Sequence, residues 1–256
     1  MLLTIDVGNT QTVIGIFDGD ELVEHWRVAS VEDRTSDEWA LLIGSFLEMA
    51  DLSFSKQVTG VAISSGVPRV TQALRDMVER YFYFQPIVLG PGIKTGMPIL
   101  YDNPKEVGAD RIADAVAAFE MYGGPTIVVD FGTATVFDAI SERGEYLGGA
   151  ICPGIQVSAA ALFQAAAGLR RVEFSAPRNV MGRSTAESLQ SGIVFGTVGL
   201  VDGMIERFQE ELGGDAVTIA TGGLAEVVLP EVDADLRYEP WLTLRGLRII
   251  YDRNVG

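Results

Sequence analysis

Two stretches of the chain place an aspartate, a glycine and small polar residues at the end of an apolar run. One is Leu2–Thr10, with Asp6 and Gly8, and the other is Thr126–Thr135, with Asp130 and Gly132. A turn rich in glycine and hydroxyl residues lets the backbone approach a ligand and points N–H and O–H donors at it. The carboxylate before the turn can hold a hydrated cation. This pattern indicates binding of a nucleotide phosphate tail.

The two copies lie about half a chain apart. They predict two similar domains that face each other across a cleft, with the phosphate tail between them. The alternative is a pair of ordinary hairpins, because Gly-Asn also forms tight turns.

Composition limits the class of protein. The 256 residues are 48% hydrophobic and 21% charged, which is typical of a globular chain with a proper core. The net charge of −16 disfavours broad binding to nucleic acid or to an anionic membrane. We find no apolar run of the ~18 residues that a membrane span needs and no signal-peptide pattern. We therefore expect a soluble cytoplasmic protein.

Histidine and cysteine are scarce. His25 is the only histidine and Cys152 the only cysteine. A zinc cage, a Ser-His-Asp triad, a Cys-His dyad and an internal disulfide are therefore excluded. Any chemistry must use carboxylates, Lys, Arg, hydroxyl groups and backbone.

Periodicity and turn residues predict an α/β order in the first half. The expected strands are Leu2–Val7, Thr12–Phe17, Glu21–Ala29, Val58–Ser64 and Pro86–Leu89. Helices are expected to begin at Ser36–Glu38, at Pro68 and after Gly108. Between them, 90–110 reads as a long ordered loop, and loops of this length are usually functional.

The second half repeats this plan. The expected strands are 126–130, 134–140, 145–151 and Val217–Thr221, with a helical region after Pro153 and a long helix over Thr185–Leu212. That helix contains four glycines at nearly helical spacing, which are Gly192, Gly196, Gly199 and Gly203. Because glycine in a helix costs about 1 kcal/mol relative to alanine, they predict close packing against a neighbouring helix or subunit.

Two common nucleotide motifs are absent. The chain has no Gly-x-x-x-x-Gly-Lys-Ser/Thr and no Gly-x-Gly-x-x-Gly that opens a helix after a strand. Here a strand turns directly into another strand, so hairpin amides would grip the phosphate.

The paired turns resemble the phosphate loops of the acetate and sugar kinase, heat-shock chaperone and actin superfamily. Within it, five segments resemble the type III pantothenate kinase family, and they are Tyr101–Arg111, Gly148–Ile155, Gly182–Ser188, Ala220–Leu224 and Leu242–Arg248. The resemblance implies duplicated ribonuclease H-like (actin-like ATPase) domains, 1–115 and 116–256. Each would hold a mixed sheet flanked by helices, with the active site in the interdomain cleft.

The same resemblance implies phosphorylation of pantothenate by ATP, the first step towards coenzyme A. Phosphoryl transfer needs charge neutralisation, alignment and a base for the attacking hydroxyl. Asp110 matches the family's proton acceptor. Without the family match, Asp110 can also be interpreted as an acidic residue in the first turn of a helix, paired with Arg111.

Further roles follow from the resemblance alone. It implies that Asp6, Val7, Gly8, Asn9, Thr10, Gln11, Thr12, Val13 and Thr133 contact ATP, with Asp6 near magnesium. Asp130 matches the position of a monovalent cation, potassium or ammonium. Tyr101, Gly108, Ala109, Asp110, Arg111 and Thr185 match substrate-binding positions. Arg111 suits the substrate carboxylate or developing phosphate charge, whereas Lys105 is either a ligand or a solvated loop charge.

Two positions depart from the family pattern. Gly66 stands where a bulkier apolar residue is more usual, and Val136 where the second loop often has another Thr. These changes put the ATP affinity in doubt and remove no proposed catalytic group.

The leading hypothesis is thus a homodimeric ATP-dependent pantothenate kinase. A second is a regulatory relative that binds nucleotide without phosphorylating anything, since family members are linked to accessory roles in gene expression. A third is a sugar or acetate kinase of the same fold, which the segment Tyr101–Arg111 disfavours.

Overall fold

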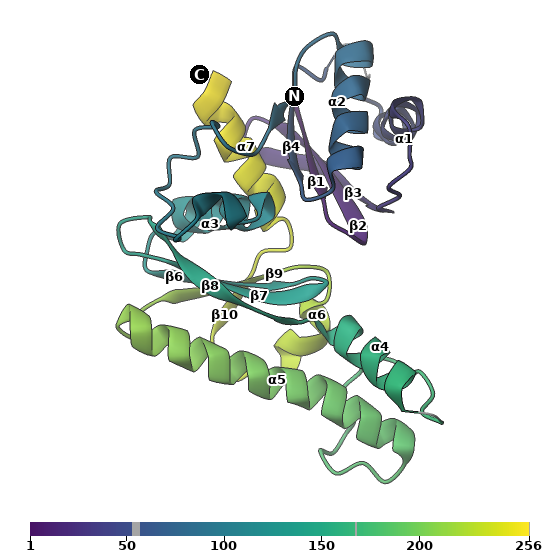
Figure 1. Cartoon of the computed structure of the whole chain (residues 1–256), viewed down its shortest axis with the longest axis vertical. Helices are drawn as coiled ribbons and strands as arrows, with labels where there is room; N and C mark the ends of the chain where they lie inside the picture. Colours follow the sequence, from purple (N-terminus) through teal and green to yellow (C-terminus); the bar gives the residue numbers. More distant parts are fainter. Residues whose placement is uncertain (53–56, 167, 256) are drawn as a thin grey trace. The chain divides into compact units, whose positions relative to one another are not determined.

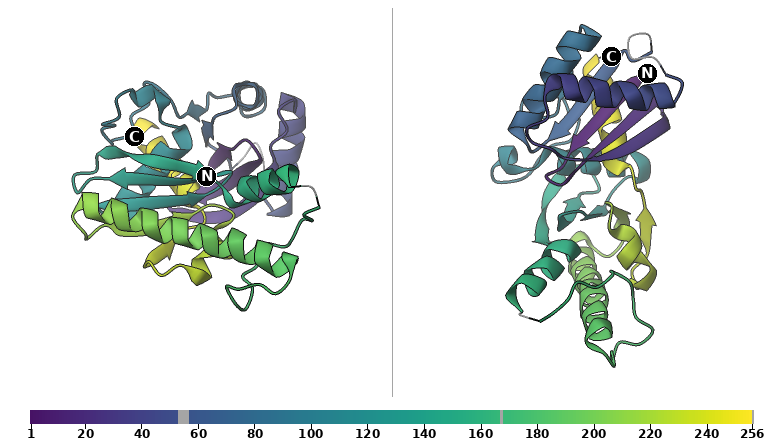
Figure 2. Two further views of the ribbon diagram at one scale, coloured as in Figure 1. Left: turned by 60° about the horizontal axis from the view of Figure 1, so that its bottom comes forward. Right: turned by 90° about the vertical axis from the view of Figure 1, so that its right-hand side faces the viewer.

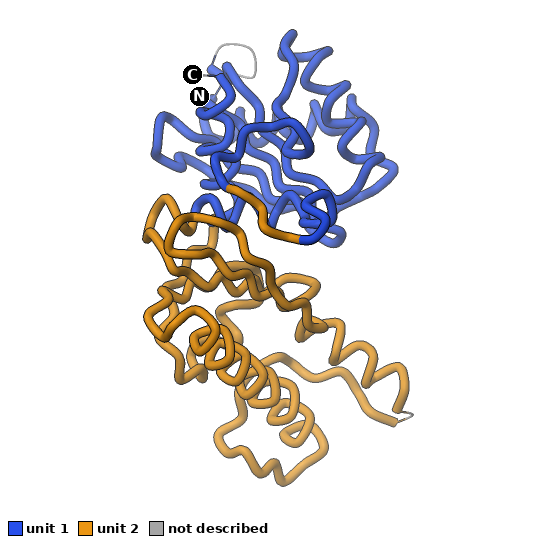
Figure 3. Tube along the Cα trace, turned by 60° about the vertical axis from the view of Figure 1, so that its left-hand side comes forward, with its two compact units in different colours: residues 1–97, 102–117, 242–256 blue, residues 98–101, 118–241 orange. Residues whose placement is uncertain are grey.

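The computed structural model describes residues 1–52, 57–166 and 168–255 and divides into two compact units (Figure 3). Unit 1 comprises Met1–Met97, Asp102–Ala117 and Leu242–Gly256, and unit 2 comprises Pro98–Tyr101 and Ala118–Trp241. The sequence-based division has a single boundary at 115/116. In the structure the main crossing is at Ala117/Ala118, and the C-terminal helix belongs to unit 1.

Unit 1 is built on a five-stranded mixed sheet of order β3-β2-β1-β4-β5. Its strands are β1 (Leu2–Val7), β2 (Gln11–Asp18), β3 (Glu21–Ala29), β4 (Gly60–Ser65) and β5 (Ile87–Val88). β1 runs antiparallel to β2 and parallel to β4 (Figure 1). β1 is central and its residues are almost all buried, as expected for a strand covered on both faces.

Helices cover both faces of this sheet. α1 (Ser36–Met49) and α2 (Pro68–Phe82) pack on one face, where Trp39 and Leu74 are fully buried with the strand residues Ile5 and Ile14. α7 (Leu242–Val255) packs on the other face, and Figure 2 shows α1 and α7 on opposite sides of the strands. There a Cβ atom at Gly15 would lie 2.7 Å from Leu244 Cδ1.

Unit 2 repeats the sheet with the order β10-β9-β6-β7-β8. Its strands are β6 (Thr126–Phe131), β7 (Ala134–Ile140), β8 (Tyr146–Pro153), β9 (Val217–Thr221) and β10 (Leu236–Tyr238). β6 is antiparallel to β7 and parallel to β9, as β1 is to β2 and β4. β6 also has the same burial pattern as β1, residue for residue.

The helices of unit 2 gather on one face. α5 (Thr185–Leu212) lies along the sheet (Figure 2), with α4 (Ile155–Ala165) and α6 (Ala225–Val228) beside it. Phe137, Val201 and Ile205 are buried in the core that forms there. The remaining helices are α3 (Ala109–Tyr122) and the short 3-10 turns Pro104–Glu106 and Leu229–Glu231.

The structure differs from the sequence-based expectation in a few elements. β5 is limited to two residues, and β10 and α7 were not expected. The cap of α1 is Thr35, one residue earlier than expected, and its hydroxyl and the Glu38 carboxylate form a reciprocal capping box. The ends of α5, by contrast, are those predicted.

The glycines of α5 do not pack closely within the chain. A Cβ atom added at Gly192, Gly196 or Gly199 would meet nothing within 4 Å. Among the described residues, the predicted close packing is therefore not seen at these three glycines.

By length and composition, α5 is the single helix in the described part of the chain that could cross a membrane. This is weak evidence for a span, because the core helix of a globular protein passes the same test. One side of α5 packs on the unit 2 core.

Candidate active site

The first predicted phosphate loop connects β1 to β2 in unit 1. The Gly8 N–H donates to the Gln11 carbonyl at 3.0 Å, and this bond closes the turn. The Ser30 hydroxyl donates to the Gly8 carbonyl at 2.6 Å and lies 2.9 Å from Thr12 Oγ1. Ser30, the residue directly after β3, therefore braces the loop, while the side chains at the tip of the loop are exposed. Sequence reasoning missed Ser30, which is distant along the chain.

Asp6 occupies the penultimate position of β1. It is in register with Val13 of β2 and Ser64 of β4, and it is half-buried. A carboxylate at this end of a central strand adjoins the loop amides that follow it. The arrangement suits a cation bound next to a phosphate group.

The predicted catalytic base lies at the start of α3, also in unit 1. Asp110 is the second residue of the helix and is exposed, and its Oδ1 accepts a hydrogen bond from the Arg111 N–H at 2.9 Å. The Gly108 carbonyl accepts from the Ile112 N–H at 3.1 Å, so the helix begins there. A Cβ atom at Gly108 would lie 2.3 Å from Asp110 Oδ1. Glycine is thus required at 108 for this orientation of the carboxylate.

The second phosphate loop connects β6 to β7 in unit 2. The Gly132 N–H donates to the Ala134 carbonyl at 3.0 Å, and Thr133 at the tip is exposed. The Gly154 N–H donates to the Thr133 carbonyl at 3.2 Å, and a Cβ atom at 154 would lie 2.3 Å from that oxygen. Gly154 is the N-cap of α4, so the start of this helix packs directly against the loop.

Asp130 is enclosed by two glycines. It is half-buried, in register with Val136 and Thr221. A Cβ atom at Gly222, whose φ is +93°, would lie 2.3 Å from Asp130 Oδ1, and one at Gly132 would lie 3.4 Å from Oδ2. The carboxylate therefore lies against bare backbone on two sides.

Two predicted substrate-binding residues belong to unit 2. Tyr101 ends the segment 98–101, and its ring lies beside that of Tyr146, with 6.3 Å between centroids. Thr185 is the exposed first residue of α5, next to the N-cap Ser184, whose hydroxyl accepts from the Glu187 N–H.

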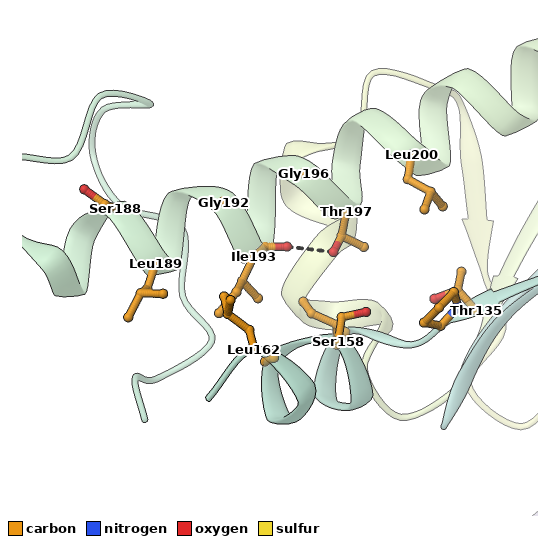
Figure 4. Close-up of a pocket in the computed structure, with 13 residues that line it drawn as sticks. Thr135, Ser158, Leu162, Ser188, Leu189, Gly192, Ile193, Gly196, Thr197 and Leu200 are labelled. Carbon is orange, nitrogen blue, oxygen red and sulfur yellow. Dashed lines mark hydrogen bonds between the residues drawn. The ribbon is translucent and has the colours of Figure 1, made fainter. Parts of the chain in front are cut away.

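A cavity of about 370 Å³ lies between α4, α5 and the adjoining ends of β7 and β8 (Figure 4). Thr135 lies at one end and Ser188 at the other, one helical turn beyond Thr185. The glycines Gly192 and Gly196 line its α5 side. Its lining is mostly apolar, with hydroxyl groups such as that of Ser158.

The structure thus distributes the predicted residues over both units. Unit 1 contains Asp6–Val13 and Gly108–Arg111, and unit 2 contains Tyr101, Asp130, Thr133 and Thr185. Within the described residues, no cluster of three or more His, Cys, Asp or Glu side chains could hold a metal ion.

Comparison with known proteins gives a match along most of the chain. The family model for type III pantothenate kinase matches residues 2–207. Type III pantothenate kinase from Moorella thermoacetica is 54% identical over 254 residues, covering 99% of this chain and 100% of the relative. The Myxococcus xanthus protein of the same name is 55% identical over 254 residues, covering 99% of each chain.

Solved structures share the fold at lower identity. A conserved Campylobacter jejuni protein assigned to the Baf family of transcriptional activators superposes with a TM-score of 0.61 at 21% identity, covering 98% of each chain. The polyphosphate/ATP-glucomannokinase of Arthrobacter sp. strain KM gives a TM-score of 0.50 at 15% identity, again over 98% of each chain. These likenesses and the two equivalent sheets confirm the predicted duplicated actin-like architecture.

Proposed function

Because the chain belongs to the type III pantothenate kinase family, we propose that it transfers the γ-phosphoryl group of ATP to the primary hydroxyl of pantothenate. The observation that carries this proposal is the identity of 54% over 99% of the chain and 100% of its Moorella relative. The presence of Asp110, exposed at the start of α3, supports it further.

Asp110 is proposed to act as the base. Its carboxylate accepts the proton of the substrate hydroxyl as that oxygen forms a bond to the γ-phosphorus. The bond from the γ-phosphorus to the bridging oxygen breaks, and ADP leaves with the electron pair. The Arg111 amide holds one carboxylate oxygen, Oδ1, so that Oδ2 is the atom proposed to receive the proton. Arg111 would stabilise the substrate carboxylate or the developing phosphate charge.

The two glycine-containing loops are proposed to bind the phosphates of ATP. In the first, Asp6–Val13 offers backbone amides and the exposed side chains of Asn9 and Thr10. In the second, Thr133 offers its exposed hydroxyl. A divalent metal, expected to be magnesium, would be held by Asp6 together with phosphate oxygens and water. Such a site needs one or two carboxylates and no protein cage, and Asp6 meets that requirement. When bound, the metal neutralises phosphate charge.

Asp130 is proposed to hold a monovalent cation, potassium or ammonium. The fit is favourable because Asp130 is a half-buried carboxylate beside the second loop, with Gly132 and Gly222 adding no side chain next to its oxygens. When bound, this cation would offset phosphate charge, which matters in a chain with a net charge of −16.

The substrate is proposed to contact Tyr101, Gly108, Ala109, Asp110, Arg111 and Thr185. We also propose that the protein is a cytoplasmic homodimer. Support for the dimer comes from Gly192, Gly196 and Gly199 of α5, beside which nothing described lies within 4 Å, and from the exposed apolar side chains Leu162 and Leu200, which line the cavity beside Gly192 and Gly196. Apolar surface of this kind often marks a protein interface.

The proposal is tested by ATP consumption of the purified protein with magnesium, with and without pantothenate, in potassium and in sodium buffer. We expect turnover that requires pantothenate and is faster in potassium. ATP binding without consumption in either buffer would overturn the kinase assignment and favour the regulatory alternative.

A further inference from the structure

Asp138 is a buried carboxylate outside the site described above. It lies on β7 with 2% of its surface exposed, and its Oδ1 accepts a hydrogen bond of 2.6 Å from the Tyr146 hydroxyl. Tyr146, the first residue of β8, is fully buried. Burial of a carboxylate is unfavourable unless it is hydrogen-bonded, so this pair calls for an explanation.

The sheet does not require a carboxylate at this position. On β7, Asp138 lies two residues after Val136, which is in register with Asp130. The equivalent residue of unit 1 is Gly15, which lies two residues after Val13 on β2. Unit 1 builds the same strand order with glycine there, packed beneath Leu244. Asp138 is therefore a feature of unit 2 that the common architecture does not explain.

The partner of Asp138 fixes the segment that carries Tyr101. The Tyr146 N–H donates to the Pro98 carbonyl at 2.9 Å, and the Tyr146 carbonyl accepts from the Leu100 N–H at 2.8 Å. These two bonds make an isolated bridge of Ile99 with Tyr146. The Tyr146 backbone thus anchors residues 98–100, directly before Tyr101.

The Tyr146 side chain and Gly148 support the ring of Tyr101. The two tyrosine rings are inclined at 57° with centroids 6.3 Å apart, a favourable tilted contact. On β8, a Cβ atom at Gly148 would lie 3.8 Å from Tyr101 Cδ2 and Cε2, and the φ of Gly148 is +140°. The ring of Tyr101 therefore packs on the Gly148 backbone and beside the ring of Tyr146. The hydroxyl of Tyr146 is in turn held by Asp138.

We propose that Asp138 and Tyr146 are positioning residues for substrate recognition, and that their hydrogen bond holds the ring of Tyr101 in the orientation that binds pantothenate. The inference rests on the proposed function and on the proposed contact of Tyr101 with pantothenate. Asp138 and Tyr146 are buried, so in this proposal they act on the substrate through another residue. We expect their effect to reach pantothenate through Tyr101, because the Tyr146 backbone anchors residues 98–100.

The test compares Tyr146→Phe with a matched variant, Tyr122→Phe. Tyr122 also donates its hydroxyl to a carboxylate of unit 2, that of Glu239, and lies outside the site. We expect Tyr146→Phe to raise the KM for pantothenate roughly 5-fold, the effect of one lost hydrogen bond, with the KM for ATP unchanged. Asp138→Ala should behave likewise, and Asp138→Asn, which retains an acceptor oxygen, should recover most of the affinity. Tyr122→Phe should change neither KM.

A double-mutant cycle decides whether Tyr146 acts through Tyr101. In a Tyr101→Ala background, Tyr146→Phe should not raise the KM for pantothenate further, since residues that act through one another are not additive. Pantothenate titration calorimetry on the same variants separates binding from turnover, and thermal melting identifies any variant that does not fold.

The outcomes are distinguishable from failure of the proposed function. If the unmodified protein does not phosphorylate pantothenate, the function is wrong and this inference fails with it. If the unmodified protein is active but Tyr146→Phe keeps its KM for pantothenate, raises both KM values equally, or adds to Tyr101→Ala, the positioning role alone is overturned.

Discussion

Asp6 and Asp130 are equivalent residues of two sheets with the same strand order. Asp6 is in register with Val13 on its antiparallel neighbour and Ser64 on its parallel neighbour, and Asp130 is in register with Val136 and Thr221 in the same way. Both are half-buried, and one residue separates each of them from the first glycine of its loop. Their surroundings nevertheless differ, because Gly222 packs against the Asp130 carboxylate. The two equivalent carboxylates therefore have different surroundings, as the two different ions proposed for them would require.

Replacing the proposed base should abolish turnover without unfolding the protein. In Asp110→Asn the amide oxygen can still accept the Arg111 N–H, so the start of α3 should keep its geometry. Loss of general-base catalysis should lower kcat roughly 10²- to 10⁴-fold, and the melting temperature should change little. Steady-state kinetics and thermal melting measure the two effects.

The matched control for this variant is Asp37→Asn. Asp37 is also an exposed second residue of a helix, α1, so the change removes a carboxylate from the same helical position. We expect its kcat to equal that of the unmodified protein. Normal turnover by Asp110→Asn, or an equal loss in both variants, would show that Asp110 is not the base.

Gly222→Ala should displace the Asp130 carboxylate in addition to straining the backbone. At φ +93° an alanine is strained, and its Cβ would lie 2.3 Å from Asp130 Oδ1. We expect the potassium concentration for half-maximal activity to rise by about tenfold, the effect of ~1.4 kcal/mol of lost cation binding. Titration of the activity with potassium chloride at constant ionic strength measures it.

Gly213→Ala separates the two effects in Gly222→Ala. Gly213, the C-cap of α5, has a φ of +95°, and a Cβ atom there would meet nothing within 4 Å. Its substitution should lower the free energy of unfolding by about 1 kcal/mol from strain alone and leave potassium activation unchanged. If both variants respond alike to potassium, the cation does not bind at Asp130.

Local sequence patterns predicted the elements whose determinants are local. The three N-terminal strands were expected from their hairpin turns, and the predicted helix Thr185–Leu212 has the observed ends, where Ser184 and Gly213 are the caps. β10 was missed because a strand of three residues is too short to show an alternation of apolar and polar side chains. α7 belongs to unit 1 because it packs on β1, β2 and β4, and its Gly246 also lies against the Ala113 backbone, where a Cβ atom would lie 2.0 Å from the carbonyl oxygen. No local pattern encodes that contact.

The candidate site was predictable to a similar extent. Asp-x-Gly turns mark the two loops, since carboxylate, glycine and hydroxyl groups stand together in the sequence. The residues that hold these groups in place, by contrast, are distant from them in the sequence or contact them only in the folded chain. Ser30 braces the first loop from another strand, and Gly222 encloses Asp130 from β9's end. Asp138 follows the second loop in sequence, but its burial against Tyr146 is a tertiary feature.

The α1 capping box predicts a pH dependence of stability. Hydrogen bonds from the Thr35 backbone and hydroxyl lower the pKa of Glu38 below its ordinary value of 4.5. A folded-state pKa below the unfolded value stabilises the protein above the unfolded pKa, and this stabilisation is lost as pH falls through the folded pKa. At pH 7, Glu38→Gln should therefore have a lower melting temperature than the unmodified protein. Well below pH 4.5, the two melting temperatures should be equal. A difference that persists unchanged in acid would mean that the charge of Glu38 is not involved.

The face of α5 that carries Gly196 should control self-association. The monomer has room for a side chain there, because a Cβ atom at 196 would meet nothing within 4 Å. Replacing a helical glycine should even stabilise the monomer by about 1 kcal/mol. In a dimer that buries this face, however, Gly196→Arg would place a charge in an apolar contact. We expect sedimentation velocity at micromolar concentration to show a dimer for the unmodified protein and a monomer for Gly196→Arg.

Ser45→Arg is the matched control, since it adds the same charge to an exposed position of α1 in unit 1. This variant should remain dimeric. A monomeric unmodified protein would remove the dimer from the proposal. A dimer that survives Gly196→Arg would place the interface elsewhere, and the open glycines of α5 would then need another explanation. Because Thr185 begins this same helix, the pantothenate KM of Gly196→Arg should also be measured. A rise that accompanies dissociation would show that substrate binding depends on the dimer.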